Sequence, residues 1–215
     1  MDLKAKRHQL IIKTKLTIEE RERCFAIFAE TFCGEPMFRY MLEGRRDLRE
    51  DTLWIAERKF RCMESYYQMY TNEGPIRGFA WWLSPTTTPK VTLWQQLRAG
   101  FAGVPFRFGP RIFKKMLDCS AHEKRILEEA AQKGPCWILD VIATDPAYQK
   151  QGLGRQFIQM IFEKADASGT DCYVLTHNER NAAFYEKSGF AMEVEEAVCS
   201  GGPTAYGLRR LPNPS

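Results

Sequence analysis

The residues with the clearest chemical potential in this chain form the segment Gln149-Lys150-Gln151-Gly152-Leu153-Gly154, which continues into Arg155. The segment lies between an apolar run at 137–143 and a stretch with helical periodicity at 155–167. A strand that leads through a glycine loop into a helix leaves backbone N–H groups unpaired at the positive end of that helix. The amides of residues 151–155 are therefore expected to bind phosphate. The side chains expected to add charge-assisted contacts are Gln149, Lys150 and Arg155.

The glycine spacing disfavours the two common nucleotide loops. No Lys-Ser/Thr pair follows the glycines, as a loop for magnesium triphosphate requires. A dinucleotide site would need a third glycine and an acidic residue about 20 positions further on, and both are missing. The diphosphate of another cofactor fits the segment better.

Two segments in this order resemble the signatures of the GNAT superfamily of N-acetyltransferases. The first runs Leu-Asp-Val-Ile-Ala-Thr-Asp-Pro over 139–146 and then Gln149-x-x-Gly152-x-Gly154. The second, at 178–190, reads Asn-Glu-Arg-Asn-Ala-Ala-Phe-Tyr-Glu-Lys-Ser-Gly-Phe, with Asn181 where alanine is usual. The resemblance is firm over 136–192. Three further features resemble puromycin-type acetyltransferases, namely Asn181 four residues before Tyr185, Trp81-Trp82-x-x-Pro85 and a long helical insert.

The resemblance implies that acetyl-CoA is the co-substrate and that its acetyl group passes directly to an amine. Main-chain groups of Val141, Ile142 and Ala143 would hold the pantetheine arm. The resemblance also implies that two strands splay here and that the N–H of Val141 or Ile142 faces the acetyl carbonyl.

Tyr185 is the expected general acid. A phenol has a pKa near 10, so it is protonated at neutral pH and can protonate a leaving thiolate. Asn181 falls on the same helical face, and Asn178, Asn181 or both would bond the pantetheine amides. As an alternative, Asn178 simply caps the helix.

The base that takes the amine proton is less sharply defined. Asp140 lies two residues before Ile142, so regular strand alternation puts both on the same side of the strand. A partly buried carboxylate there would have a raised pKa and could accept the proton or bind the amine. Equally, it could be paired with an arginine. Outside candidates are Glu35, Glu195 and Glu196, whereas a lone His177 at a strand end is more often structural.

The bulk properties are those of one soluble globular domain over 1–215. The chain has 215 residues, 44% hydrophobic and 27% charged, and a net charge of +4, which suits a polyanionic cofactor. Part of the excess lies in the first 15 residues, more simply a solvated tail than an arm for nucleic acid or membrane. Seven scattered cysteines and three distant histidines argue against a metal or disulfide framework and for the cytoplasm. Neither a membrane span nor a secretory signal is evident.

The pattern of apolar residues predicts an α/β fold of the GNAT type. It is a mixed central β-sheet flanked by helices on both faces, with a helical insert at 84–134 before a cofactor-binding core at 136–192. The expected strands are 9–14, 66–70, 76–83, 136–144, 171–176, 189–198 and 204–210. The expected helices begin after Thr17 and at 47, 91, 111, 151 and 179.

The leading interpretation is an N-acetyltransferase that uses acetyl-CoA and acts on a primary amine of a small molecule. The insert would leave less room for a protein surface than an open groove. The alternatives are a peptide or protein N-acetyltransferase and a non-catalytic acyl-CoA-binding regulatory module. The presence of Tyr185 argues against the binding module. Nucleic-acid binding through the aromatic and arginine side chains of the insert is a further, weaker reading. The chain could be a monomer or a homodimer.

Overall fold

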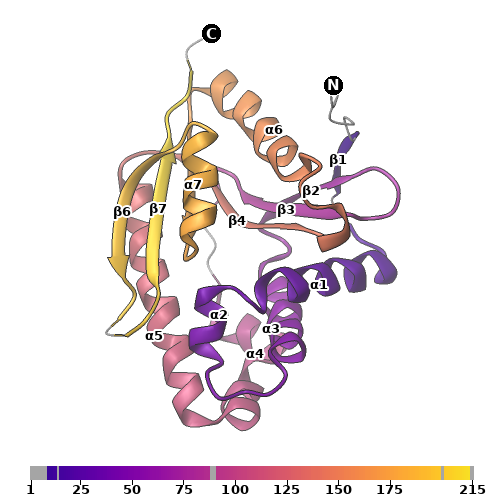
Figure 1. Ribbon diagram of the computed structural model, residues 1–215, viewed down its shortest axis with the longest axis vertical. Helices are drawn as coiled ribbons and strands as arrows, with labels where there is room; N and C mark the ends of the chain where they lie inside the picture. Colours follow the sequence, from indigo (N-terminus) through magenta and orange to yellow (C-terminus); the bar gives the residue numbers. More distant parts are fainter. Residues whose placement is uncertain (1–8, 14, 88–90, 200, 214–215) are drawn as a thin grey trace.

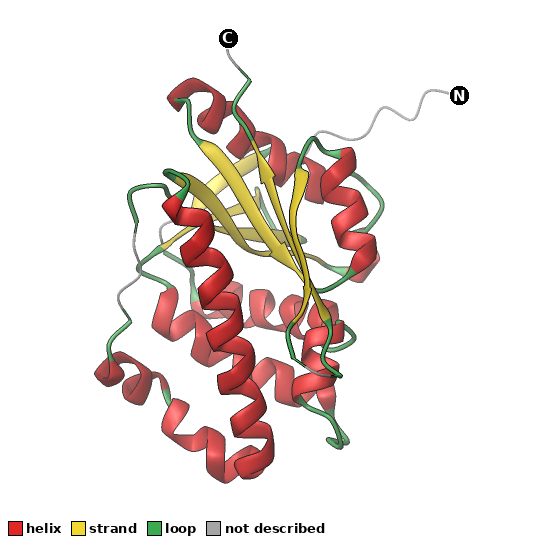
Figure 2. Ribbon diagram, turned by 90° about the vertical axis from the view of Figure 1, so that its left-hand side faces the viewer, coloured by secondary structure: helices red, strands yellow, loops and turns green. Residues whose placement is uncertain are grey.

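A seven-stranded sheet organises the computed structural model, which describes residues 9–13, 15–87, 91–199 and 201–213. Helices cover both faces of the sheet (Figures 1 and 2). The strands are β1 Leu10–Lys13, β2 Tyr67–Asn72, β3 Gly78–Leu83, β4 Cys136–Thr144, β5 Asp171–Thr176, β6 Ala191–Ala197 and β7 Thr204–Arg210. The α-helices are α1 Ile18–Phe32, α2 Pro36–Met41, α3 Leu48–Met63, α4 Leu93–Ala99, α5 Val104–Gln132, α6 Leu153–Ser168 and α7 Glu179–Lys187. Short 3-10 turns are η1 Phe101–Gly103 and η2 Pro146–Tyr148.

The strand order is β1-β2-β3-β4-β5-β7-β6. β4 and β5 pair in parallel, with α6 as the crossover helix between them, and the other neighbouring strands pair antiparallel. The predicted mixed sheet with helices on both faces is thus confirmed. Thr14 and the basic positions Lys4, Lys6 and Arg7 lie outside the described residues.

Each face of the sheet is closed by its own helices. α1 and α3 pack Phe25, Phe28 and Phe60 against Trp81 of β3. On the opposite face, α6 and α7 form a second core around Trp82 and Phe157. α5 covers the β5–β7 end of the sheet on the α1 side, and Figure 2 views the molecule from that helix. β4 therefore runs through the middle of the molecule between two apolar layers.

Local sequence signals explain the first helix. Thr17 accepts a hydrogen bond from the Glu20 amide, and the Glu20 side chain accepts one from the Thr17 amide. This reciprocal pair is a capping box, which satisfies two of the N–H groups that a helix start leaves unpaired. The expected cap at Thr17 is thereby confirmed.

The insert contains the two predicted helices, but the second begins earlier than expected. α5 starts at Val104, bends at Gly109, whose φ is 77°, and continues through Pro110 to Gln132. The expected start at residue 111 coincides with this bend, because proline removes a helix hydrogen bond and starts a new helical direction. In the described residues the insert therefore consists of α4, a short helical piece before the bend at Gly109, and one long helix from the bend to Gln132.

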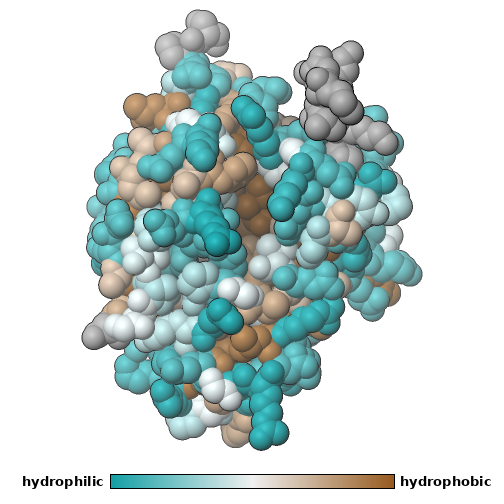
Figure 3. All heavy atoms as spheres, viewed as in Figure 1, coloured by the Kyte–Doolittle hydropathy of each residue, from teal (hydrophilic) through white to brown (hydrophobic). Residues whose placement is uncertain are grey.

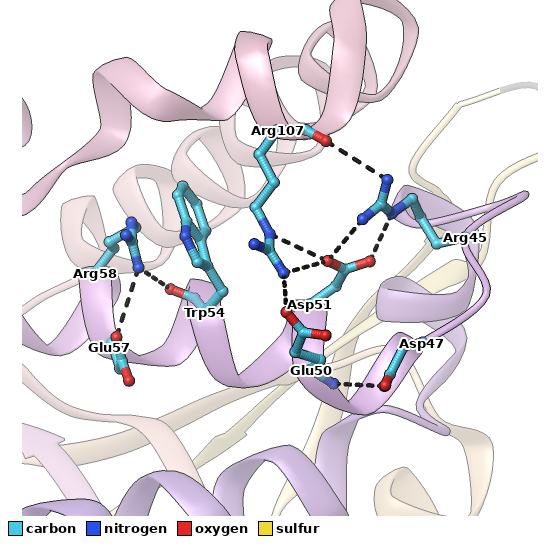
Figure 4. A network of polar contacts seen from close by, with 8 residues as sticks. All are labelled: Arg45, Asp47, Glu50, Asp51, Trp54, Glu57, Arg58 and Arg107. Atoms are coloured by element: carbon cyan, nitrogen blue, oxygen red, sulfur yellow. Dashed lines mark hydrogen bonds and ion pairs between the residues drawn. The ribbon is translucent and has the colours of Figure 1, made fainter.

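A buried carboxylate fastens the insert to α3 (Figure 4). Asp51, whose side chain is 2% exposed, accepts two hydrogen bonds from Arg45, at 2.6 and 3.0 Å. It also accepts two from Arg107 of α5, at 3.2 and 3.0 Å. Phe108 is buried beside them against Trp54. These insert side chains, which the nucleic-acid reading invoked, serve packing, whereas Trp94 and Phe106 are exposed.

Candidate active site

The parting of β4 from β5 opens a cavity in the middle of the fold. The two strands pair only from Cys136 to Leu139, opposite 171–174, although both continue further. A cavity of about 550 Å³ lies at this point. Figure 3 shows a hydrophobic hollow between hydrophilic side chains, where Figure 1 places β4 beside α7. The expected splay of two strands at the cofactor strand is present.

The glycine loop leads into the start of α6, which lies at this cavity and has no side-chain cap. Lys150 and Gly152 have positive φ, at 61° and 84°, and no side chain caps α6. The Gln156 amide donates to the Gly152 carbonyl at 3.1 Å, so the amides of residues 153–155 precede the hydrogen-bonded part of the helix. A Cβ at Gly154 would touch Ile142 at 3.7 Å and nothing nearer, so the approach to these amides is open.

The loop side chains divide into braces and exposed cations. Gln149 donates to the Thr144 carbonyl at 3.1 Å, and Gln151 donates to the Ala147 carbonyl at 3.5 Å. Both amide side chains thereby hold the loop in place. Lys150 and Arg155 are exposed and have no ion-pair partner among the described residues. A helix end with free amides and two exposed cations fits a diphosphate group.

The cavity includes some of the predicted site residues and leaves others outside. The predicted residues that line it are Asp140, Val141, Ile142, Gln149, Gly154, Asn181 and Tyr185. Ala143 and Leu153 are instead fully buried in the two cores that flank β4. Lys150, Gln151, Gly152 and Arg155 are exposed on the loop and the first turn of α6.

Tyr185 lines the cavity, and its hydroxyl makes no hydrogen bond among the described residues. The residue is 4% exposed and packs against Phe184 and Phe190. Burial, and then the nearby Glu35 carboxylate, raise the pKa of Tyr185 above its usual range. The phenol is therefore firmly protonated at neutral pH, as a proton donor requires.

The two asparagines have different surroundings. Asn178 accepts a hydrogen bond from the Arg180 amide as the cap of α7, and its amide nitrogen donates to both oxygens of Glu35 at 3.1 and 3.0 Å. Its polar atoms are thus engaged, which favours the capping alternative over contact with a pantetheine amide. Asn181 lines the cavity beside Tyr185 and keeps the expected position.

A β-bulge changes the expected orientation of Asp140. Trp82 pairs with Leu139 and Trp81 with Val141, so Asp140 has no partner on β3. One extra residue reverses the alternation of side chains. Asp140 accordingly bonds to α3 and β2, while Ile142 packs on the α6 side. The expectation that Asp140 and Ile142 share a side was wrong, because a bulge leaves no trace in a pattern of apolar residues.

The Asp140 carboxylate has two partners of its own. Lys59 of α3 lies 3.1 and 3.0 Å from its two oxygens, and the Tyr67 hydroxyl donates to it. Burial would lower the pKa of Lys59, but Asp140 and Glu123 raise it overall, so the ammonium is retained. Asp140 is paired, as one expectation held, although the partner is a lysine and not an arginine.

Glu123 of α5 is a cavity residue that the sequence did not reveal. Its side chain is 39% exposed. Partial desolvation by the surrounding protein, with a further contribution from Asp140 against that of Lys59, raises its pKa to about 6. The Nε2 of His177 lies 3.8 Å from its carboxylate. Glu35 and His177 also line the cavity, whereas Glu195 and Glu196 do not. Nothing in the spacing of the helical insert could distinguish Glu123 from its exposed neighbours.

Comparison with known proteins agrees with this geometry at the level of the fold. A structure from Corynebacterium glutamicum, described as histone acetyltransferase HPA2 and related acetyltransferase, has a TM-score of 0.65 at 16% identity, covering 97% of this chain and 98% of that one. The C-terminal condensation domain of Ebony with beta-alanyl-dopamine has a TM-score of 0.59 at 13% identity, covering 95% and 99%. A GCN5-related N-acetyltransferase structure from Rhodopseudomonas palustris has 0.53 at 14%, covering 96% of both chains.

Metal-binding clusters and membrane-spanning helices are both absent from the described residues. No group of three or more histidine, cysteine, aspartate or glutamate side chains there is arranged to hold a metal ion. No helix in the same residues is long and apolar enough to cross a bilayer.

The family itself is shown by sequence. The model of the acetyltransferase (GNAT) family matches residues 63–190, which span β2 to α7 and contain the splayed strands, the glycine loop and Tyr185. The chain belongs to the GNAT family of acetyltransferases.

Proposed function

We propose that this protein transfers the acetyl group of acetyl-CoA directly to a primary amine of a small molecule. One observation supports this most strongly: the uncapped start of α6 and Tyr185, whose hydroxyl has no hydrogen-bond partner among the described residues, line the same cavity between β4 and β5. Anion binding and proton donation are thus available at two walls of one space.

The residues present fit the cofactor. The amides of 153–155 would bind the diphosphate, with Lys150 and Arg155 beside them. Beyond Leu139, β4 has no bonds to β5, so the backbone at Val141 and Ile142 can pair with an extended amide chain. When bound, acetyl-CoA supplies a thioester carbonyl carbon for the amine nitrogen to attack. Tyr185 holds the proton that the departing sulfur needs.

The walls of the cavity favour a small acceptor. Phe32 and Phe38 border it from α1 and α2, and Leu127 borders it from α5. The helical insert that carries α5 is fastened to α3 by Asp51. An acceptor must fit beneath these helices, which suits a small amine better than a folded protein. A flexible peptide N-terminus is the second candidate, since it too can enter a narrow space.

An aspartate at Gly154 should separate cofactor binding from folding. Gly154→Asp puts a carboxylate in the first turn of α6, where a negative charge stabilises the helix by about 0.5 kcal/mol. The same charge repels a bound diphosphate, so acetyl-CoA affinity should fall by more than about tenfold. Calorimetric titration and thermal melting measure the two effects. Gly154→Ala is the matched control and should bind nearly normally, because its Cβ has room.

The function is tested by thiol release from acetyl-CoA in the presence of puromycin, spermidine or a peptide that starts with alanine. Release that depends on a small amine, with the acetylated amine identified by mass spectrometry, is the expected result. Release with the peptide alone would transfer the proposal to the peptide class. Tight binding of acetyl-CoA with no release beyond slow hydrolysis would favour the non-catalytic binding module.

A further inference from the structure

Three carboxylates line the cavity, and their partners differ. Asp140 is bonded to Lys59 and Tyr67, and Glu35 accepts two hydrogen bonds from Asn178. The third, Glu123, has no hydrogen bond among the described residues. A proton acceptor has to be free of competing donors, and among these carboxylates Glu123 meets that condition.

His177 supplies a second, independent sign of a ligand beside Glu123. Its side chain is nine-tenths buried, its Nε2 has no hydrogen-bond partner, and the residue lines the same cavity. The separation of 3.8 Å between this nitrogen and the Glu123 carboxylate exceeds a hydrogen bond. Burial, together with His122, lowers the pKa of His177 to about 4, so the ring is neutral at pH 7 and forms no ion pair. An unpaired buried nitrogen costs free energy unless a bound group completes it.

We infer that Glu123 is the general base that takes the proton from the acceptor, and that the acceptor therefore enters as a cationic amine. This inference rests on the function proposed above and names its acceptor class. An ammonium group carries several donors, so it can serve the Glu123 carboxylate and the neutral His177 nitrogen together. The described lining of the cavity is also net negative, because it includes one cation and three carboxylates. These are Lys59 and then Glu35, Glu123 and Asp140.

The proton balance of the transfer closes with these groups. The acceptor ammonium gives one proton to Glu123 and becomes a nucleophilic amine. As the nitrogen–carbon bond forms and the carbon–sulfur bond breaks, Tyr185 gives its proton to the sulfur. The second nitrogen proton restores the Tyr185 hydroxyl, and Glu123 releases its proton to solvent. One proton is liberated per amide formed, and no oxidant, metal or further reactant is needed.

Charged and titratable groups from several elements share the cavity with Glu123. Lys59 from α3, Asp140 from β4, His177 after β5, Glu35 before α2 and the Tyr185 hydroxyl from α7 all line the cavity with it. The carboxylate titrates near pH 6, so it is ionised at pH 7 and becomes protonated as the pH falls below 6. The kcat/KM for the amine should therefore rise with pH through about 6 and then level off.

Glu123→Gln keeps the shape of the side chain and removes the base. With the best acceptor among puromycin, spermidine and the alanine-starting peptide, kcat/KM at pH 7.5 should fall about 100-fold or more. The rise near pH 6 should disappear, while acetyl-CoA affinity stays within about twofold of the unaltered protein. Glu128→Gln is the matched control. It makes the same change on the same helix at an exposed position outside the cavity, and should leave rate and pH profile unchanged.

A direct titration provides a readout without turnover. In protein labelled with 13C at the glutamate carboxyls, one resonance should titrate near pH 6 and be absent from Glu123→Gln. Lys59→Met removes the cation that lowers this pKa, so the same resonance should titrate at higher pH. If Glu123 is the base, the rise of kcat/KM in Lys59→Met should move to higher pH together with this resonance, whereas a merely structural role would leave the rise where it was.

The outcomes separate this inference from the function on which it rests. If the unaltered protein acetylates an amine and Glu123→Gln retains its rate within threefold, or keeps the rise near pH 6, Glu123 is not the base. Transfer to none of the three amines by the unaltered protein overturns the proposed function together with this role.

Discussion

Tyr185→Phe is expected to lower kcat by about 100- to 1000-fold while acetyl-CoA affinity changes by less than about twofold. The substitution removes one hydroxyl and keeps the ring, which is buried in the core that α6 and α7 form on one face of the sheet. That hydroxyl makes no hydrogen bond among the described residues, so its loss leaves no protein group unpaired. The folded state should consequently keep its stability, and the deficit should lie in proton transfer to the sulfur.

Single-turnover measurements locate this deficit. Rapid mixing of the protein, acetyl-CoA and the acceptor should show a slow chemical step in Tyr185→Phe, with binding of both substrates intact. Tyr173→Phe is a suitable control, because it removes a hydroxyl from a buried tyrosine that does not line the cavity. A normal rate in Tyr185→Phe would assign the proton to another donor, and a large loss of acetyl-CoA affinity would make the hydroxyl a binding group.

The parts of the site that the sequence predicts are those set by local physics. A run of apolar residues, a loop with Gly152 and a following amphipathic helix together specify a strand, a turn and an uncapped helix start. Each of these depends on neighbours along the chain, and the structure has each where expected. Asn178 caps α7, as the capping alternative expected, and Tyr185 of that helix lines the cavity, while its role as the acid stays a prediction.

The parts that the sequence did not predict depend on contacts across the fold. Asp140 turns toward α3 because of a bulge opposite Trp81 and Trp82, and no apolar periodicity contains that information. Glu123 and Lys59 are 64 positions apart in the sequence, on α5 and α3, and they line one cavity only because these helices pack over the sheet. The amphipathic helix α5 has three glutamates, at 123, 128 and 129, and its sequence alone cannot tell the cavity residue from the solvated ones.

The role proposed for Glu123 depends on how firmly the helical insert is held, because α5 belongs to that insert. α3 carries Lys59 and α5 carries Glu123, and the two helices are joined by the hydrogen bonds between Asp51 and Arg107. The proposed cofactor-binding elements β4 and α6 pack closely together with β3. A Cβ at Gly78 of β3 would lie 2.8 Å from the Ala143 carbonyl of β4 and 3.0 Å from Leu153 of α6. The insert and the cofactor-binding elements should therefore respond separately to damage.

Asp51→Ala tests this separation and should be the most destabilising single change considered. It leaves the guanidinium groups of Arg45 and Arg107 without their buried carboxylate, which costs about 3 kcal/mol, at the low end for a buried pair because both arginines are partly exposed. In a chain of 215 residues this lowers the melting temperature by about 10 °C. The Michaelis constant for the amine should rise severalfold, because α5 loses its anchor, while acetyl-CoA affinity persists.

The control for this change is Glu50→Gln, which alters an exposed carboxylate that contacts the same Arg107 at 2.7 Å. An exposed ion pair contributes less than about 1 kcal/mol, so this variant should melt within about 3 °C of the unaltered protein. Limited proteolysis should cut Asp51→Ala first between α4 and the bend of α5, whereas the β4–α6 region stays protected. Equal melting temperatures for the two variants, or early cleavage in β4–α6, would mean that the insert is held by its apolar contacts with Leu42 and Phe108 and not by Asp51.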